Sequence, residues 1–291
     1  MKLNKTLKFI FLGIAIIVSF LIGTLYPKVE QLQKGKTSNN NAEKEVDKEM
    51  VLPEKGFDLP ISFADFGPRL IELGVIDKDK FIAAVNMTSD EEKILLEGTE
   101  NSININADNS QFVVDMLWAI GLAQKSIVYT EGPMGKEYKK DVGNFSSTGG
   151  WSLAKENATG YLGKFELIEL SENQHKRVAE IAKNVYRPCC GNSTWFPDCN
   201  HGMAALAAIE MMVAKNMSDD EIYKNILKLN SFWFPSTYMT TAKYFLNKGV
   251  TWDKVDAKLI LGPEYSSSSG ASRITKEIDP VPVFGGGSCG A

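Results

Sequence analysis

An uncharged run over residues 9–26 is the feature that most limits how this chain folds. Its 18 residues reach the lower end of the length range for a helix that spans a bilayer. Lys2, Lys5 and Lys8 precede the run and favour an N-terminus in the cytoplasm. A cleaved signal peptide usually has a shorter apolar stretch, and no clear small-x-small cleavage site follows here. We therefore expect a basic cytoplasmic segment over residues 1–8 and an uncleaved signal anchor over residues 9–26, with cleavage as the alternative.

The residues after this run are expected to lie outside the cytoplasm, at the cell membrane. Residues 27–56 are rich in Lys, Glu, Gln, Asn and Ser and hold few apolar side chains. Such a composition cannot bury enough surface to form a core. We expect a flexible stalk that holds a folded domain away from the membrane, so the membrane is a partner through a single N-terminal helix.

The overall composition excludes several classes of protein. Hydrophobic residues make up 44% of the chain and charged residues 23%, which is ordinary for a globular protein and excludes a wholly disordered, collagen-like or polytopic membrane chain. The formal charge of −4 gives no sign of a nucleic-acid partner, which usually requires a basic surface. Three consecutive glycines at residues 285–287 lack the context of a phosphate-binding loop, so no nucleotide cofactor is expected.

Residues 57–262 show mainly helical patterns and predict a single helical globular domain. Thr88 or Ser89 can cap one helix, with an acidic residue three positions later. The strongly apolar segment 110–124 predicts a central buried helix. Further helices are expected at residues 173–186, 199–215, 219–229, 235–247 and 252–261. A long Gly-rich loop at 132–163, one short strand at 165–170 and an extended tail at 263–291 complete the predicted mainly α fold.

The segment that carries chemistry is RPCCGNSTWFPDCNHG, which begins at Arg187. Pro and Gly bracket Cys189 and Cys190 and place them on a loop, whereas Cys199 and His201 lie where the next helix begins. Thiolates together with an imidazole are the ligands that a soft metal ion prefers. A helix N-terminus also lowers the pKa of a nearby thiol. The pattern predicts a site for a thiophilic metal ion or for thiol redox chemistry.

The spacing departs from common zinc motifs, because the pattern is Cys-Cys, eight residues, then Cys-x-His. Adjacent cysteines usually point their side chains apart, so joint ligation by Cys189 and Cys190 requires an unusual backbone. By ligand softness, copper, mercury or another thiophilic ion fits at least as well as zinc. An iron–sulfur cluster is disfavoured because the chain has no twin-arginine export signal.

Four other residues are expected to contribute to this site. Cys289 lies between glycines near the end of the chain and is expected to reach in as a further ligand or a resolving thiol. Arg187 would add positive charge beside the thiols, and Asp198 would hydrogen-bond the His201 imidazole. Asp198 and Asn200 are also candidates to cap the helix or to orient a catalytic base.

Three alternatives compete with a metal site. Exported proteins favour disulfides, so a Cys190–Cys199 bridge together with a Cys189–Cys289 bridge would make the domain a non-enzymatic scaffold or interaction module. In the second alternative His201 caps or packs within the first turn of its helix and ligates nothing. In the third, Cys199 is a buried small apolar residue. A Cys–His nucleophilic enzyme is a further reading, so enzymatic activity stays open. The preferred hypothesis is a membrane-anchored protein that binds copper or zinc, or exchanges thiols, with an exchange partner for the metal or the thiol.

Overall fold

The computed structural model describes residues 45–279 and residue 281. By internal contacts the chain divides into residues 1–45 and residues 46–291, and the fold described here is that of the second unit. The predicted signal anchor, most of the predicted stalk and Cys289 lie outside the described residues. Within the described part of the chain, no helix is long and apolar enough to cross a membrane.

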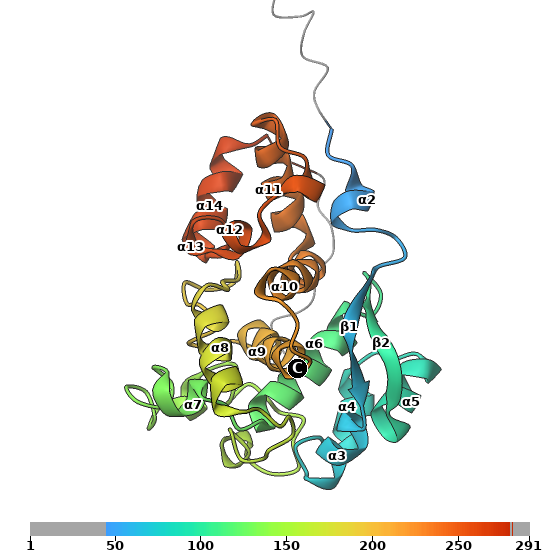
Figure 1. Ribbon diagram of the computed structural model, residues 1–291. Helices are drawn as coiled ribbons and strands as arrows, with labels where there is room; N and C mark the ends of the chain where they lie inside the picture. The colour runs from blue at the N-terminus through green and yellow to red at the C-terminus, as the bar shows by residue number, and fades with distance from the viewer. Residues whose placement is uncertain (1–44, 280, 282–291) are drawn as a thin grey trace, which may run out of the picture. The chain divides into compact units, whose positions relative to one another are not determined.

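The described unit is mainly helical, as the sequence predicts (Figure 1). Its first half consists of α2 (Lys48–Val51), β1 (Phe57–Ala64), α3 (Phe66–Glu72), α4 (Lys78–Ala84), α5 (Ser89–Glu97), β2 (Thr99–Ile105), α6 (Ser110–Ala123) and α7 (Val128–Glu131). Its second half consists of α8 (Glu172–Lys183), α9 (Asn200–Ala214), α10 (Asp219–Trp233), α11 (Pro235–Asn247), α12 (Ala257–Leu261), α13 (Pro263–Ser266) and α14 (Ser268–Glu277), with short 3-10 turns η1 (Val142–Asn144), η2 (Ala158–Gly160) and η3 (Trp252–Lys254).

Helices α6 and α9 pack against each other and form the centre of the core. Both are buried on every side over most of their length, which explains why neither shows a one-sided apolar pattern. The two backbones approach closely at Gly121, where a Cβ atom would lie 2.3 Å from the carbonyl oxygen of Met203. The buried helix predicted at 110–124 is confirmed, and a glycine sets its distance from α9.

Replacing Gly121 with alanine is expected to lower the free energy of unfolding by about 1–3 kcal/mol, the usual cost of inserting a methyl group into a packed core. The higher helix propensity of alanine offsets only about 1 kcal/mol of the strain. Denaturant unfolding measures the change. Gly160→Ala is the control, because a Cβ at Gly160 meets nothing within 4 Å. Equal stability of the two variants would show that α6 and α9 can separate at no cost.

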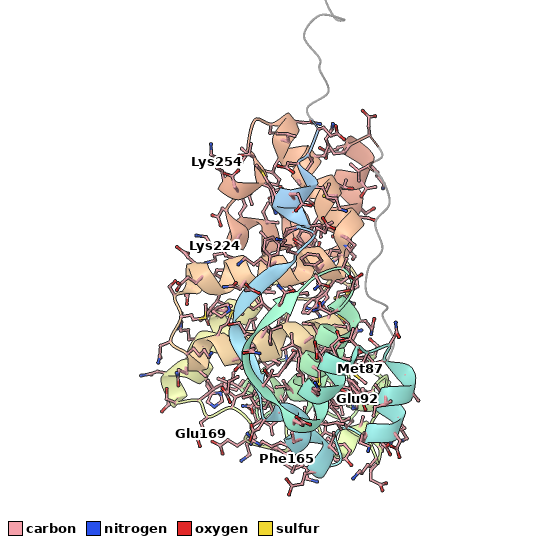
Figure 2. The ribbon with its side chains drawn as sticks, turned by 90° about the vertical axis from the view of Figure 1, so that its right-hand side faces the viewer. Met87, Glu92, Phe165, Glu169, Lys224 and Lys254 are labelled. Carbon is pink, nitrogen blue, oxygen red and sulfur yellow. The ribbon has the colours of Figure 1, made fainter. Side chains whose placement is uncertain are left out.

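Two strands that the sequence patterns did not reveal lie against this helical core. β1 and β2 pair antiparallel, with Phe57 opposite Ile105 and Ser62 opposite Ser102. Figure 2 shows them side by side across one face, with α5 beside them at Glu92. Leu59, Ile61 and Phe63 alternate with more exposed positions, which is the period-two signal of a half-buried strand. Residues 57–64 therefore belong to a two-stranded sheet.

Three predicted boundaries differ from the structure. The end of the predicted stalk belongs to the folded unit, because Val51 and Leu52 of the α2 region are buried in the core. The extended tail expected from residue 263 onward is wrong over 263–277, where α13 and α14 form and Ile274 is buried. The strand expected at 165–170 is reduced to one isolated bridge between Gln124 and Phe165. In the first two cases a few apolar side chains pack onto the core from a segment that is polar on average.

The Gly-rich segment between α7 and α8 is irregular apart from two short 3-10 turns, as predicted. Several of its backbone groups contact the buried core. The Trp118 indole of α6 donates a hydrogen bond to the carbonyl of Ser147 at 2.6 Å. The Ser147 amide donates in turn to the carbonyl of Asp198 at 3.2 Å, and the Ser146 hydroxyl donates to the same carbonyl at 3.1 Å. This loop therefore ties the segment just before α9 to the centre of the fold.

Candidate metal centre

Three of the predicted site residues converge at the N-terminus of α9. The sulfur atoms of Cys189, Cys190 and Cys199 all lie within 4.8 Å of one another. Cys199 is 3.4 Å from the Cys189 sulfur and 3.9 Å from the Cys190 sulfur. A tetrahedral ion with metal–sulfur bonds of about 2.3 Å has sulfur–sulfur edges of about 3.8 Å. The three thiols, named here the cysteine triad, are therefore spaced to share one soft metal ion.

The expectation that adjacent cysteines point apart is wrong for Cys189 and Cys190, because both sulfurs lie close to Cys199. The loop from Arg187 turns back on itself, with the Cys190 amide donating to the Arg187 carbonyl at 3.3 Å. The Cys190 carbonyl accepts a hydrogen bond from the Ser268 amide at the start of α14. These contacts bring both thiols of the pair to the side of Cys199, and Cys189 stays exposed to solvent.

Cys199 is itself the N-cap of α9, a position that the sequence pattern assigns to Asp198 or Asn200. Its sulfur accepts a hydrogen bond from the Gly202 amide at 3.4 Å. Amide groups at a helix N-terminus lack partners within the helix and favour negative charge nearby. The cap prediction was wrong because the cysteine takes the place of the usual oxygen-bearing side chain. This position also points the sulfur toward the loop that carries the other two thiols.

The Arg187 guanidinium is fully buried beneath the triad. Its Nε donates to the Cys199 sulfur at 3.1 Å, and its Nη2 donates to Asp198 Oδ1 at 2.9 Å. Its remaining contacts go to the carbonyls of Asn192 at 3.0 Å and Phe196 at 3.2 Å. One cation therefore holds the cysteine loop in shape and neutralises charge at Cys199, which supports the predicted place of Arg187 beside the thiols.

These hydrogen bonds distribute the protons of the triad unequally. The bonds from Cys189 and Cys190, followed by the charge of Arg187, lower the pKa of the Cys199 thiol well below its ordinary value despite burial. The hydrogen bonds to Cys190 and Cys199 raise the pKa of Cys189. Cys190 has its pKa raised to about 12, because its bond to Cys199 and burial outweigh the opposite effect of Cys189. Cys199 is thus the most acidic thiol of the group.

Asp198 does not hydrogen-bond His201, so that expectation was wrong. Asp198 Oδ1 accepts from Arg187, and its Oδ2 accepts from the Asn192 side chain at 2.7 Å. Both carboxylate oxygens are therefore hydrogen-bonded, and Asp198 is the counter-charge of Arg187. Asn192 closes the loop through both its carbonyl and its side chain. Nothing in the sequence pattern distinguishes this asparagine from the others, because its partners come together only through the turn at Cys190.

Gly202 is required by the same packing. A Cβ atom at this position would lie 2.4 Å from the Arg187 Cζ, which is an impossible contact. The guanidinium lies flat against the first turn of α9 where this glycine leaves room. Glycine in a helix interior usually costs stability relative to alanine. Its presence here is explained by the buried arginine.

His201 lies beside the triad but is not one of the three ligand groups within 4.8 Å. Its ring is fully buried and packs against Trp233 and Phe234, with ring centroids 5.6 Å and 4.5 Å apart. Burial lowers the pKa of the imidazole to about 4, so the ring is neutral at pH 7. Neither ring nitrogen has a hydrogen-bond partner among the described residues. The base–thiol hydrogen bond that a Cys–His enzyme requires is therefore not formed here.

Asn200, the remaining predicted residue, is buried in the first turn of α9, where its Oδ1 accepts from the His201 amide at 2.9 Å. The Cys190–Cys199 bridge of the disulfide alternative is not formed, because the two sulfurs are 3.9 Å apart and a disulfide bond measures about 2.05 Å. The partner of Cys189 in that alternative is Cys289, which lies outside the described residues.

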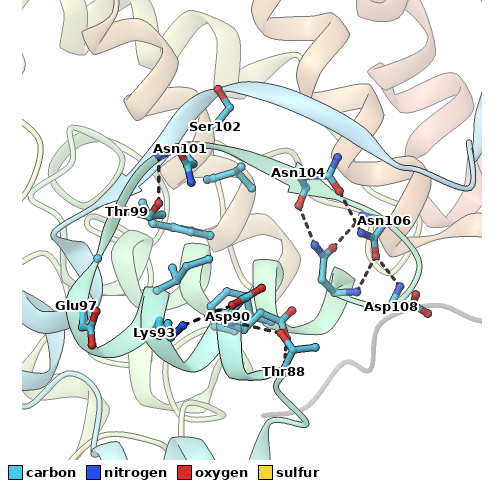
Figure 3. Close-up of a pocket in the computed structure, with 17 residues that line it drawn as sticks. Thr88, Asp90, Lys93, Glu97, Thr99, Asn101, Ser102, Asn104, Asn106 and Asp108 are labelled. Carbon is cyan, nitrogen blue, oxygen red and sulfur yellow. Dashed lines mark hydrogen bonds and ion pairs between the residues drawn. The ribbon is translucent and has the colours of Figure 1, made fainter.

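A separate pocket of about 780 Å³ lies between α5 and β2 (Figure 3). Asn101, Asn104 and Asn106 line it together with Thr88 and Lys93. Two of its asparagines already have partners: Asn106 Oδ1 accepts from the amides of Asp108 and Asn109, and Asn104 Nδ2 donates to the Lys55 carbonyl and to Asp58 Oδ1. No cysteine lines it. The chemistry of the triad is therefore independent of this pocket.

The fold and the site together define a mainly helical protein with a three-thiol cluster at the N-terminus of a buried central helix. Comparisons with protein-family models, with curated proteins and with solved structures find no match for this chain. The function proposed below therefore rests on the chemistry of the site.

Proposed function

We propose that this protein binds one thiophilic metal ion, copper or zinc, through Cys189, Cys190 and Cys199, in a domain that the segment 9–26 anchors outside the cytoplasm. The observation that carries the proposal is the mutual approach of three sulfur atoms to within 4.8 Å. Thiolate sulfur is the ligand type that selects these ions over magnesium or calcium. Arg187 offsets part of the negative charge that three thiolates would gather.

Differences in exposure within the triad support acceptance and transfer of the ion. Cys189 is exposed, whereas Cys190 and Cys199 are half-buried. An incoming ion would meet Cys189 first and then pass to the thiolate of Cys199, 3.4 Å away. Release to a partner would reverse these ligand exchanges. His201 and Cys289 remain candidates for a fourth ligand.

Cysteine 199 provides the sharpest test of metal binding. In the full-length protein, purified in detergent and fully reduced, Cys199→Ser is expected to lower the affinity for Cu(I) and Zn(II) by at least ~100-fold. The loss of a direct ligand should exceed the 10–100-fold cost of losing an outer partner. Competition with a chromophoric chelator measures the affinities, and elemental analysis gives the stoichiometry, expected as one ion per chain.

The two histidines offer a matched pair of controls. His175→Gln should leave metal affinity unchanged, whereas His201→Gln lowers it if the imidazole completes the site. Thiol titration of the protein purified without reductant decides the disulfide alternative. No free thiol together with no bound ion would contradict metal binding and favour a scaffold that two disulfides stabilise.

Thiol–disulfide exchange is a second candidate function, favoured by the position of Cys199 at a helix N-cap beside a buried arginine. The Cys199 thiolate would attack a disulfide of a partner protein and form a mixed disulfide. The Cys189 thiol, 3.4 Å away, would then attack Cys199 and release the partner as a dithiol. The pair loses two electrons and the partner gains them. Trapping of a mixed disulfide through Cys199 in a Cys189→Ser, Cys190→Ser protein tests this reaction.

A further inference from the structure

We propose that the species this triad binds best is a trivalent, three-coordinate metalloid of the class of arsenous and antimonous acids. This inference rests on the proposed function and narrows its ligand from soft ions in general to one oxidation state and one coordination number.

The number of ligands matches a three-coordinate centre. Among the described residues, only the three sulfurs form a group of ligand atoms within 4.8 Å of one another. The nearest carboxylate in sequence, Asp198, has both oxygens bonded to Arg187 and Asn192. The His201 ring packs against aromatic side chains. A trivalent arsenic or antimony centre is complete with three sulfurs, whereas a structural zinc ion takes four ligands.

The charge around the triad also favours a trivalent centre. Arg187 contacts both Cys199 and Asp198, so it offsets charge locally at Cys199, but with Asp198 at 2.9 Å the two side chains add no net charge to the site. Three thiolates bring a charge of −3, so a trivalent centre leaves the site neutral, a divalent ion leaves −1 and Cu(I) leaves −2. Uncompensated charge is costly where solvent is partly excluded. Two of the three sulfurs are half-buried and Arg187 is fully buried, so this cost applies here.

The open side of the triad suits a pyramidal centre with a lone pair. With bonds of about 2.3 Å, the 3.4 Å separation of Cys189 and Cys199 corresponds to an angle of about 95° at the central atom, and the 3.9 Å separation of Cys190 and Cys199 to about 116°. These angles lie on either side of the tetrahedral value, so the spacing admits three bonds to one atom. A lone pair occupies the side opposite the three bonds. Exposure of Cys189 leaves the triad open toward solvent, where the lone pair can lie without a fourth ligand.

The condensation balances with two thiol protons. The sulfur–sulfur contacts at 3.4 Å and 3.9 Å are hydrogen bonds, and each such bond contains one thiol proton. Arsenous acid, As(OH)₃, would form three As–S bonds with two thiols and the Cys199 thiolate. Of the three hydroxides released from the broken As–O bonds, two leave as water with the thiol protons and the third takes up one proton from solvent, so no atom changes its oxidation state. A divalent ion instead expels the two thiol protons to solvent.

The test compares arsenite with Zn(II) on the full-length protein in detergent, reduced with a phosphine. We expect one arsenite per chain, bound more tightly than Zn(II). Calorimetry in two buffers of different ionisation enthalpy should show uptake of about one proton for arsenite and release of protons for Zn(II). X-ray absorption at the arsenic edge should show three sulfur neighbours and no oxygen.

Two variants sharpen this test. Cys190→Ser should lower arsenite affinity by at least ~100-fold, since a ligand is lost. Cys289→Ser should change it less than about twofold, because the triad alone completes the centre. The matched loop control is Ser193→Ala, with no expected change. Circular dichroism checks that each variant is folded. If a variant does not fold, X-ray absorption on the unaltered protein decides which atoms bind arsenic.

The outcomes separate the two proposals. Zinc or copper binding to the triad with weaker arsenite binding, or an arsenic centre that keeps an oxygen neighbour, would overturn this inference and leave the proposed function intact. If arsenite, Zn(II) and Cu(I) all fail to bind the reduced protein with a stoichiometry of one, both proposals are overturned. Arsenite bound by three sulfurs more tightly than zinc supports both.

Discussion

Replacing Arg187 with alanine is expected to lower the free energy of unfolding by about 3–5 kcal/mol, the range for removing one partner of a buried ion pair. The guanidinium is fully buried, and its loss leaves the Asp198 carboxylate without its counter-charge. The carbonyls of Asn192 and Phe196 would lose their donors at the same time. Urea unfolding under reducing conditions, followed by far-UV circular dichroism, measures the change.

A double-mutant cycle identifies the origin of this effect. Arg187→Ala combined with Asp198→Asn should be less destabilised than the sum of the two single variants, because no unpaired charge remains. Arg187→Lys keeps the charge but cannot form four directed hydrogen bonds, so intermediate stability is expected. A loss below about 1 kcal/mol in Arg187→Ala would mean that the cysteine loop holds its shape without the guanidinium.

Replacing Glu210 with glutamine is expected to raise stability at alkaline pH by as much as about 5 kcal/mol. Glu210 is fully buried in α9, and neither carboxylate oxygen has a hydrogen-bond partner among the described residues. Burial raises the pKa of this carboxyl group to about 8 from an ordinary value of 4.5, with a smaller opposite effect of the Ser126 side chain. One pKa unit corresponds to about 1.4 kcal/mol, which gives the expected limit.

The direction of the pH dependence follows from the protonation of Glu210 in the folded and the unfolded state. Below pH 4.5, Glu210 is protonated in both the folded and the unfolded state and costs nothing. Between pH 4.5 and about 8, the unfolded chain releases the proton while the folded chain keeps it, so stability falls as the pH rises. Above about pH 8 the penalty is constant. The stability gain of Glu210→Gln should therefore be absent near pH 4.5 and largest above pH 8.

Unfolding midpoints at several pH values between 4.5 and 9 test this prediction, with Glu156→Gln, an exposed position, as the control. A residual slope is expected in Glu210→Gln, because burial also raises the pKa of Asp115 in α6 to about 7. Adding Asp115→Asn to Glu210→Gln should remove this residual dependence of stability on pH. A gain in Glu210→Gln that does not depend on pH would contradict a proton-linked origin.

The helices were largely predictable because their signals are local. Thr88 and Glu91 form the capping box that their spacing predicts, and the apolar run at 110–124 is the buried helix α6. The strands were missed because period-two alternation in a single short segment is a weak signal. α14 was missed because its run of serines hides two small buried residues and Ile274, which only the packing identifies.

The sequence also placed the candidate site within one short segment, since Cys189, Cys190, Cys199 and Arg187 could all be named from residue type and spacing. It assigned the wrong partner to Asp198 and a different residue to the cap of α9. Both errors concern side-chain direction, which depends on the turn at Cys190 and on the space that Gly202 leaves for the guanidinium. Spacing along a chain carries no information about such directions.

The order of the residues therefore predicts the local features: an apolar N-terminal run, helices with caps, and thiols close to the start of a helix. The tertiary structure decided that adjacent cysteines face the same sulfur, that Cys199 caps α9, and that one buried arginine joins the loop to the helix. The physical reason is that caps and periodicity act over a few residues. Convergence of three sulfurs and burial of a cation depend instead on backbone contacts between segments that are distant in the chain, such as those of Ser147 and Ser268 with the cysteine segment.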